Sequence, residues 1–162
     1  MKIEQRWLDR LYPDFNIDVA AEQAALVAAD IIVWQFPFHW YALPALLKKW
    51  VDDVLVFGFA HGIGGDKLHG KKLILSFTTG APAAAYAHGQ PMNYTIDEFM
   101  PPLRQTALLC GMDFLAPVHS CGMRFIPGVS SDADRANVEA RGHNHADRLI
   151  AQIQSAPARQ AE

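Results

Sequence analysis

The sequence predicts one α/β domain in which a parallel sheet lies between two helical layers. Two apolar runs, Ile31–Trp34 and Leu73–Phe77, are too short to cross a membrane and are typical of strands buried on both faces of a sheet. Segments with helical periodicity alternate with them, a pattern typical of parallel sheets with right-handed crossovers. The 162 residues, 51% of them hydrophobic, suffice for one core, so we expect a single domain over residues 1–162.

Composition and charge indicate which kinds of partner the protein can bind and in which cellular compartment it is expected. The formal net charge is only −3, and no stretch of Lys and Arg forms a basic face, which excludes a nucleic-acid partner. The first ten residues are too charged for a secretory signal, and no apolar run is long enough to span a bilayer, so we expect a cytoplasmic protein. Cys110 and Cys121 could form a disulfide, but two reduced, buried thiols are the default in that compartment.

The elements follow from local signals. Pro13 marks a turn, Asp18 can cap the next helix, Pro44 opens another, and Thr95 with Glu98 forms a capping-box pattern. Residues 3–8 fit a strand or a frayed helix equally well. We expect strands over residues 30–35, 73–77 and 112–118, and helices over residues 19–28, 44–57, 95–110 (kinked at the prolines 101–102) and 131–155.

The predicted site lies where the first two strands end. An aromatic loop, Pro37-Phe38-His39-Trp40-Tyr41, follows the first strand, and a loop of small residues, Thr78-Thr79-Gly80, follows the second and leads to Tyr86. The carboxyl ends of neighbouring parallel strands share one rim of a sheet, where ligands bind. Small residues leave backbone amides open to a ligand, so the two loops predict a flat aromatic ligand at this rim.

Other conspicuous residues have simpler interpretations. Core packing is expected for Trp34, Leu47, Trp50 and Phe57, whereas Trp40 and Tyr41 lie in a loop and need a ligand or a second subunit to cover them. The glycine-rich run 58–66 follows a helix and precedes a strand, which excludes a dinucleotide-binding fingerprint and leaves a mobile flap or a plain connector. His143 and His145 lie two residues apart on a helix, face different directions and make a poor metal pair, and we expect no metal.

These motifs together resemble the flavodoxin-like NAD(P)H:quinone oxidoreductases, a family that includes the ancillary subunits of glutathione-gated potassium efflux systems. The resemblance covers about residues 11 to 125. The segments that match the family are Asp30–Val54, Gly58–Gly62, Leu68–Lys71, Thr78–Gly80 with Tyr86, and Gly111-Met112.

The resemblance implies a bound flavin, FMN or FAD, with NAD(P)H as the electron donor and a quinone as the acceptor. The loop Pro37–Tyr41 would lie along the isoalloxazine ring, and Thr78, Thr79 and Gly80 would contact its polar edge. Tyr86 would hydrogen-bond a quinone oxygen, assisted by His88, although His88 departs from the family's spacing.

The resemblance further implies a homodimer. Two functions are alternatives to the enzyme: a regulatory subunit of a potassium efflux antiporter, located at the inner membrane as a peripheral protein, and an inactive fragment.

The amino end departs from the family. Members begin with a strand and a small-residue loop that binds the flavin phosphate at a helix N-terminus, whereas this chain first matches near Leu11-Tyr12. In the strand order 2-1-3-4-5 the missing strand adjoins residues 30–35, so we expect an N-terminally truncated fold with an open strand edge. A start codon assigned too far downstream is the favoured explanation; a degenerate fragment and a short paralogue that pairs with another chain are the alternatives.

Overall fold

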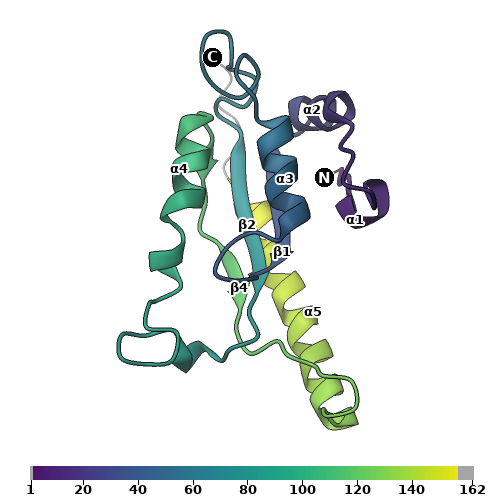
Figure 1. Cartoon of the computed structure of the whole chain (residues 1–162), viewed down its shortest axis with the longest axis vertical. Helices are drawn as coiled ribbons and strands as arrows, with labels where there is room; N and C mark the ends of the chain where they lie inside the picture. The colour runs from purple at the N-terminus through teal and green to yellow at the C-terminus, as the bar shows by residue number, and fades with distance from the viewer. Residues whose placement is uncertain (1, 157–162) are drawn as a thin grey trace.

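A central strand, β2 (Lys72–Thr78), organises the sheet in the computed structural model, which describes residues 2–156. On one side β2 pairs in parallel with β1 (Ile31–Pro37), and on the other with β3 (Asp113–Phe114) and then β4 (Val118–Ser120). The helices are α1 (Leu8–Leu11), α2 (Val19–Ala28), α3 (Ala45–Val54), α4 (Pro101–Leu109) and α5 (Asp132–Ser155), with 3-10 turns η1 (Ala83–Ala85) and η2 (Asp97–Phe99). The α/β parallel sheet predicted from the sequence is confirmed (Figure 1).

The two faces of the sheet are covered unequally. On one face, side chains of β1 and β2 form the main core with α2, α3 and α4: Ile32, Trp34, Phe36, Leu73, Leu75 and Phe77. On the other face α5 packs against β4 and runs behind the sheet in Figure 1. There Ile31 and Val33 are only half-buried and Gln35 is exposed. The prediction that the first strand is buried on both faces was therefore wrong. The main contacts of α5 are with β4, and His145 of α5 also contacts Ser76 of β2, so this face of β1 is only partly covered.

The open edge expected for the first strand is present in the described residues. There β1 pairs with β2 alone, and no described strand precedes Ile31. The segment before it contains α1, α2 and a turn after Tyr12, so residues 3–8 are neither a strand nor, except for Leu8, a helix. Cys110 and Cys121 are free and buried, as expected. Among the described helices, none is long and apolar enough to cross a membrane.

Prolines shift two predicted elements. The expected strand over residues 112–118 is split into β3 and β4, because Pro117 between them has no N–H to donate to the ladder. The second part, β4, extends to Ser120. The expected helix over residues 95–110 begins instead at Pro101, since proline is tolerated in a first turn but not in a helix interior. Thr95 and Glu98 do make their capping contact, but on the turn η2.

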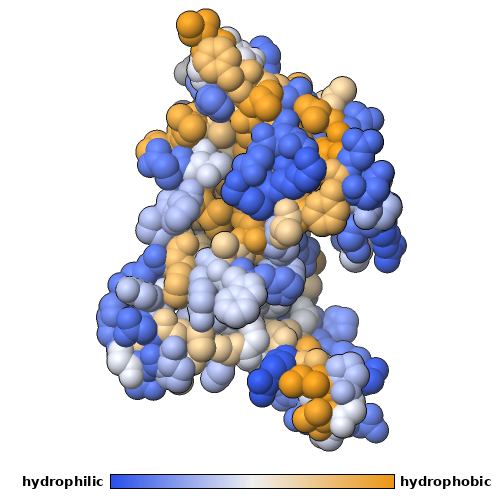
Figure 2. Space-filling view, in the orientation of Figure 1, coloured by the Kyte–Doolittle hydropathy of each residue, from blue (hydrophilic) through white to orange (hydrophobic). Residues whose placement is uncertain are grey.

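The glycine-rich run lies at the opposite end of β2 from the predicted site. It enters β2 at Lys72, whereas the site begins after Thr78, one strand length of about 20 Å away. Within one chain the run therefore connects α3 to β2 and does not cover the site. Phe57, just before the run, is 66% exposed, which corrects its assignment to the core, and Ile63 within the run is 89% exposed. Hydrophobic surface gathers at this upper end of the molecule (Figure 2).

A buried carboxylate joins the amino-terminal segment to the core. Glu22 of α2 is 1% exposed and accepts hydrogen bonds from Arg6 Nε (2.9 Å) and Nη2 (2.7 Å) and from the Tyr12 hydroxyl. The indole Nε1 of Trp50 in α3 donates to its other oxygen at 2.9 Å. Four donors thus satisfy a charge that would otherwise be costly to bury.

Replacing this carboxylate should destabilise the fold. Glu22→Gln keeps the side-chain shape but removes the charge that Arg6, Tyr12 and Trp50 contact, so we expect the free energy of unfolding to fall by about 2–3 kcal/mol. Urea unfolding followed by circular dichroism measures the change. Glu139→Gln, an exposed site on α5, is the control and should stay within about 0.5 kcal/mol of wild type. Equal effects of the two substitutions would contradict the importance of the cluster.

The same cluster predicts acid sensitivity. Burial raises the pKa of Glu22, but the hydrogen bonds from Arg6, Tyr12 and Trp50 outweigh burial and hold this pKa below its usual 4.5. Below about pH 4.5 the unfolded state therefore takes up a proton that the folded state resists, and stability falls as the pH drops. Urea unfolding between about pH 7 and pH 3 should show the gap between wild type and Glu22→Gln narrowing in acid. A gap that widens in acid would refute the assignment.

Candidate functional site at the carboxyl ends of β1 and β2

The two predicted loops begin side by side. In the parallel register Pro37 is the partner of Thr78, the last residue of each strand. The pairing extends one step further, because the amide of Phe38 donates to the carbonyl of Thr78 at 2.8 Å. The prediction that both loops lie on one rim of the sheet is therefore confirmed, and both lie toward the lower end of β2 in Figure 1.

The aromatic loop divides into a buried anchor and an exposed tip. Phe38 is buried with its ring 5.2 Å from that of Phe77, so it packs into the core beneath the rim. His39 and Ala42 close a tight turn, and the two residues between them, Trp40 and Tyr41, have positive φ angles of 47° and 63°. Non-glycine residues rarely adopt this conformation, and it is often found at functional sites. The turn presents Trp40 with 91% of its surface exposed.

The loop after β2 divides in a similar way. Thr79 is 2% exposed; its amide donates to the Ser120 carbonyl (3.0 Å) and its hydroxyl to the Ala81 carbonyl (2.9 Å). Its own carbonyl accepts from the amide of Met123 at 2.8 Å. Thr79 therefore shapes the loop. Gly80 is exposed, and a Cβ built on it would meet no described atom within 4 Å, so its backbone is open to a ligand.

A residue that sequence reasoning missed connects these loops. Phe99 of η2 stacks on Tyr41 with ring centroids 5.1 Å apart, and Tyr86 meets it edge-on at 6.3 Å. Phe38 and Tyr94 also contact Phe99, at 5.8 Å each. The structure thus brings Tyr86 to the aromatic loop. No local signal identifies Phe99, because its contacts join segments that are far apart in the sequence.

The other predicted catalytic residue, His88, contacts Glu98 and Tyr94. His88 is exposed, with Nε2 3.1 Å from the Glu98 carboxylate and its ring edge-on to Tyr94. The amide and hydroxyl of Thr95, followed by the charge of His88, keep the pKa of Glu98 below its usual range. The described contacts therefore pair His88 with Glu98, and none joins it to Tyr86.

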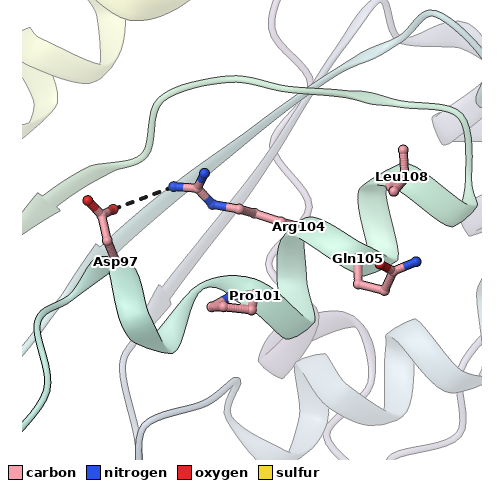
Figure 3. A pocket seen from close by; sticks show the side chains of 5 residues that line it. All are labelled: Asp97, Pro101, Arg104, Gln105 and Leu108. Carbon is pink, nitrogen blue, oxygen red and sulfur yellow. Dashed lines mark hydrogen bonds and ion pairs between the residues drawn. The ribbon is translucent and has the colours of Figure 1, made fainter.

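A surface depression is formed by residues other than the predicted ones. Its volume is about 450 Å³, and it is lined by five residues of η2 and α4, namely Asp97, Pro101, Arg104, Gln105 and Leu108 (Figure 3). Arg104 lies 3.5 Å from Asp97 across it. It includes none of the predicted site residues. No group of three or more metal-ligating side chains occurs among residues 2–156, and His143 is exposed where His145 is buried, as their spacing predicted.

Comparison with known proteins adds to this geometry. A family model described as a flavodoxin-like fold matches residues 2–146. The glutathione-regulated potassium-efflux system ancillary protein KefF of Salmonella typhimurium is 44% identical over 149 residues, which cover 92% of this chain and 80% of that protein.

Solved structures agree in fold. The general stress protein 14 of Treponema denticola, in complex with FMN, is 36% identical with a TM-score of 0.78, over 90% of this chain and 79% of that chain. The NADPH-quinone reductase of P. pentosaceus is 27% identical with a TM-score of 0.65, over 85% of this chain and 86% of that one. The chain therefore belongs to the family of flavodoxin-like folds.

Proposed function

We propose that this chain is a flavin-dependent NAD(P)H:quinone oxidoreductase that uses FMN or FAD. The observation that carries the proposal is the rim itself, where an exposed aromatic tip at Trp40 and an open glycine backbone at Gly80 follow two directly paired strands. The FMN complex of the Treponema denticola relative and the name of the P. pentosaceus quinone reductase support it. A bound flavin would accept a hydride from NAD(P)H and return two electrons to a quinone.

The residues of the rim fit a flavin ring in distinct ways. Trp40 and Tyr41 offer flat faces for stacking, and Phe38 anchors their loop by packing on Phe77 in the core. The exposed backbone of Gly80 and the half-buried Thr78 offer donors to the polar edge of the ring, where reduced flavin carries negative charge. Pro37 and His39 border the turn, and Thr79 acts by fixing the loop.

We propose that Tyr86 contacts the quinone. Its ring packs edge-on against Phe99, on which Tyr41 also stacks, so Tyr86 lies in the same aromatic cluster as Tyr41. A phenol can donate a hydrogen bond to a quinone oxygen as negative charge develops on it. For His88 we retain only an assisting role, exerted through Glu98 and Tyr94 near this cluster.

A second candidate is a regulatory subunit of a glutathione-gated potassium efflux antiporter, favoured by the 44% identity to KefF. In that case docking on the transporter would matter more than turnover, and the protein would be cytoplasmic and peripheral to the inner membrane. A Tyr86→Phe variant that still co-purifies with such a transporter and activates it would favour this function.

We also propose a homodimer, because the exposed side chains of Trp40 and Ile63 both present apolar surface that a second copy could cover.

Removing the exposed indole should weaken flavin binding. Trp40→Ala deletes the proposed stacking face, so we expect the dissociation constant for FMN to rise by about three- to tenfold. Quenching of flavin fluorescence on titration measures it. Trp7→Ala removes another half-exposed tryptophan, in the amino-terminal segment, and should leave the constant unchanged. If wild-type protein takes up neither FMN nor FAD, the enzyme proposal fails, and the regulatory subunit and the inactive fragment are the functions left.

Removing the Tyr86 hydroxyl should slow quinone reduction without weakening flavin binding. For Tyr86→Phe we expect the rate of flavin reoxidation by a benzoquinone to fall by about tenfold or more, because one donor to the developing charge is lost. Stopped-flow absorbance of the pre-reduced protein measures this step. Tyr94→Phe, which alters another tyrosine that packs on Phe99, is the control. Equal rates for the two variants would exclude Tyr86 from the reaction.

A further inference from the structure

A face of α5 that the proposed chemistry does not use carries three basic side chains. Arg141, His145 and Arg148 are spaced four and three residues apart and so lie on one side of the helix. We call them the basic face of α5. Each of them bonds to the segment at the end of β4, residues 119–122.

His145 is the buried centre of this face. It is 5% exposed; its Nδ1 lies 2.9 Å from the Ser120 hydroxyl and its Nε2 lies 2.9 Å from the Ser76 hydroxyl. A neutral imidazole has one donor and one acceptor, and two hydroxyls use both of them. Burial, and then the charges of Arg148 on the same helix and His119 on β4, lower the pKa of His145. The neutral ring is therefore the form that links β2 to β4.

The two arginines hold the backbone on either side of His145. Arg148 donates to the carbonyl of His119 at 3.0 Å and to the Ser120 hydroxyl at 2.6 Å. Arg141 donates to the carbonyls of Cys121 and Gly122. Charge-assisted bonds to successive carbonyls fix the path of this short segment.

The segment in turn holds the loop after β2. The Ser120 carbonyl accepts from the amide of Thr79, the amide of Gly122 donates to the Ala81 carbonyl at 2.7 Å, and Met123 donates to the Thr79 carbonyl. These backbone bonds flank Gly80 on both sides. A continuous series of hydrogen bonds thus runs from the basic face of α5, through residues 119–123, to the open backbone at the rim.

We propose that His145 is a positioning residue, assisted by Arg141 and Arg148. Together they fix the backbone around Gly80 at the place where this backbone would meet the edge of the flavin. The inference rests on the proposed flavin site for its function, but its structural part can be tested without a ligand. His145 touches no proposed reacting group. It acts through Ser120 and Thr79.

The first test is amide hydrogen exchange on the flavin-free chain. In His145→Ala we expect the Thr79 and Met123 amides to exchange about tenfold faster, because the hold on Ser120 is lost, while Leu75 in the centre of β2 stays near its wild-type rate. His145→Asn places an amide where Nδ1 faces Ser120 and should restore slow exchange. His143→Ala, at the exposed histidine two residues earlier, is the matched control and should change nothing.

Arg141→Met supplies a second variant should His145→Ala fail to fold. It removes the contacts to Cys121 and Gly122 from an exposed side chain, and we expect faster exchange at Gly122 and Met123. Exchange at Thr79 that matches the His143→Ala control, or a rise at Leu75 as large as that at Thr79, would overturn the proposal.

The second test adds FMN. His145→Ala should raise the dissociation constant by about fivefold or more and change the visible circular dichroism of the bound flavin, whereas His145→Asn and His143→Ala should resemble wild type. An unchanged constant and an unchanged spectrum in His145→Ala would overturn the positioning role. If no variant binds FMN while Thr79 exchange changes as expected, positioning of the loop by His145 holds and the proposed flavin site is what fails.

Discussion

The parallel register between β1 and β2 is the constraint on which the site depends. Because Pro37 is paired with Thr78, both strands end at the same level and their following loops leave the sheet together. The same register places Trp34 beside Leu75 and Phe36 beside Phe77 on the core face. A slip of one residue would turn these side chains to the opposite face, so the burial that stabilises the domain also fixes the place of the rim.

The rim combines a rigid frame with an open front. Thr79 and Phe38 are buried and bonded or packed internally, while their neighbours Gly80 and Trp40 face outward. This division explains how a loop can expose an aromatic side chain with positive φ, since the rest of the loop is held by the strand ladder. Packing of Phe38 into the core holds the loop after β1. On the other side of β2, the polar contacts of α5 with residues 119–122 hold the loop after β2.

Much of this arrangement can be predicted from sequence. The bounds of α2 agree with the predicted 19–28, and β1, β2 and α5 lie within one or two residues of prediction, because apolar runs and capping residues are local signals. Long-range contacts leave no such signal. Glu22 looks like an ordinary helix glutamate and Phe99 like an ordinary helix aromatic, although one is a buried hub for Arg6, Tyr12 and Trp50 and the other joins the two loops. The roles of Phe38 as the buried anchor and Trp40 as the exposed tip were likewise not predictable. They depend on a turn geometry that the residue types do not specify.

The central claim is that a flavin ring lies on this rim, and an amide chemical-shift titration of the labelled chain with FMN tests it most directly. The account predicts the largest shifts at Gly80 and Trp40, with smaller ones at Tyr86, and none in the depression on α4. Shifts confined to Arg104 and Leu108, or saturable flavin binding that leaves Gly80 and Trp40 unmoved, would contradict it.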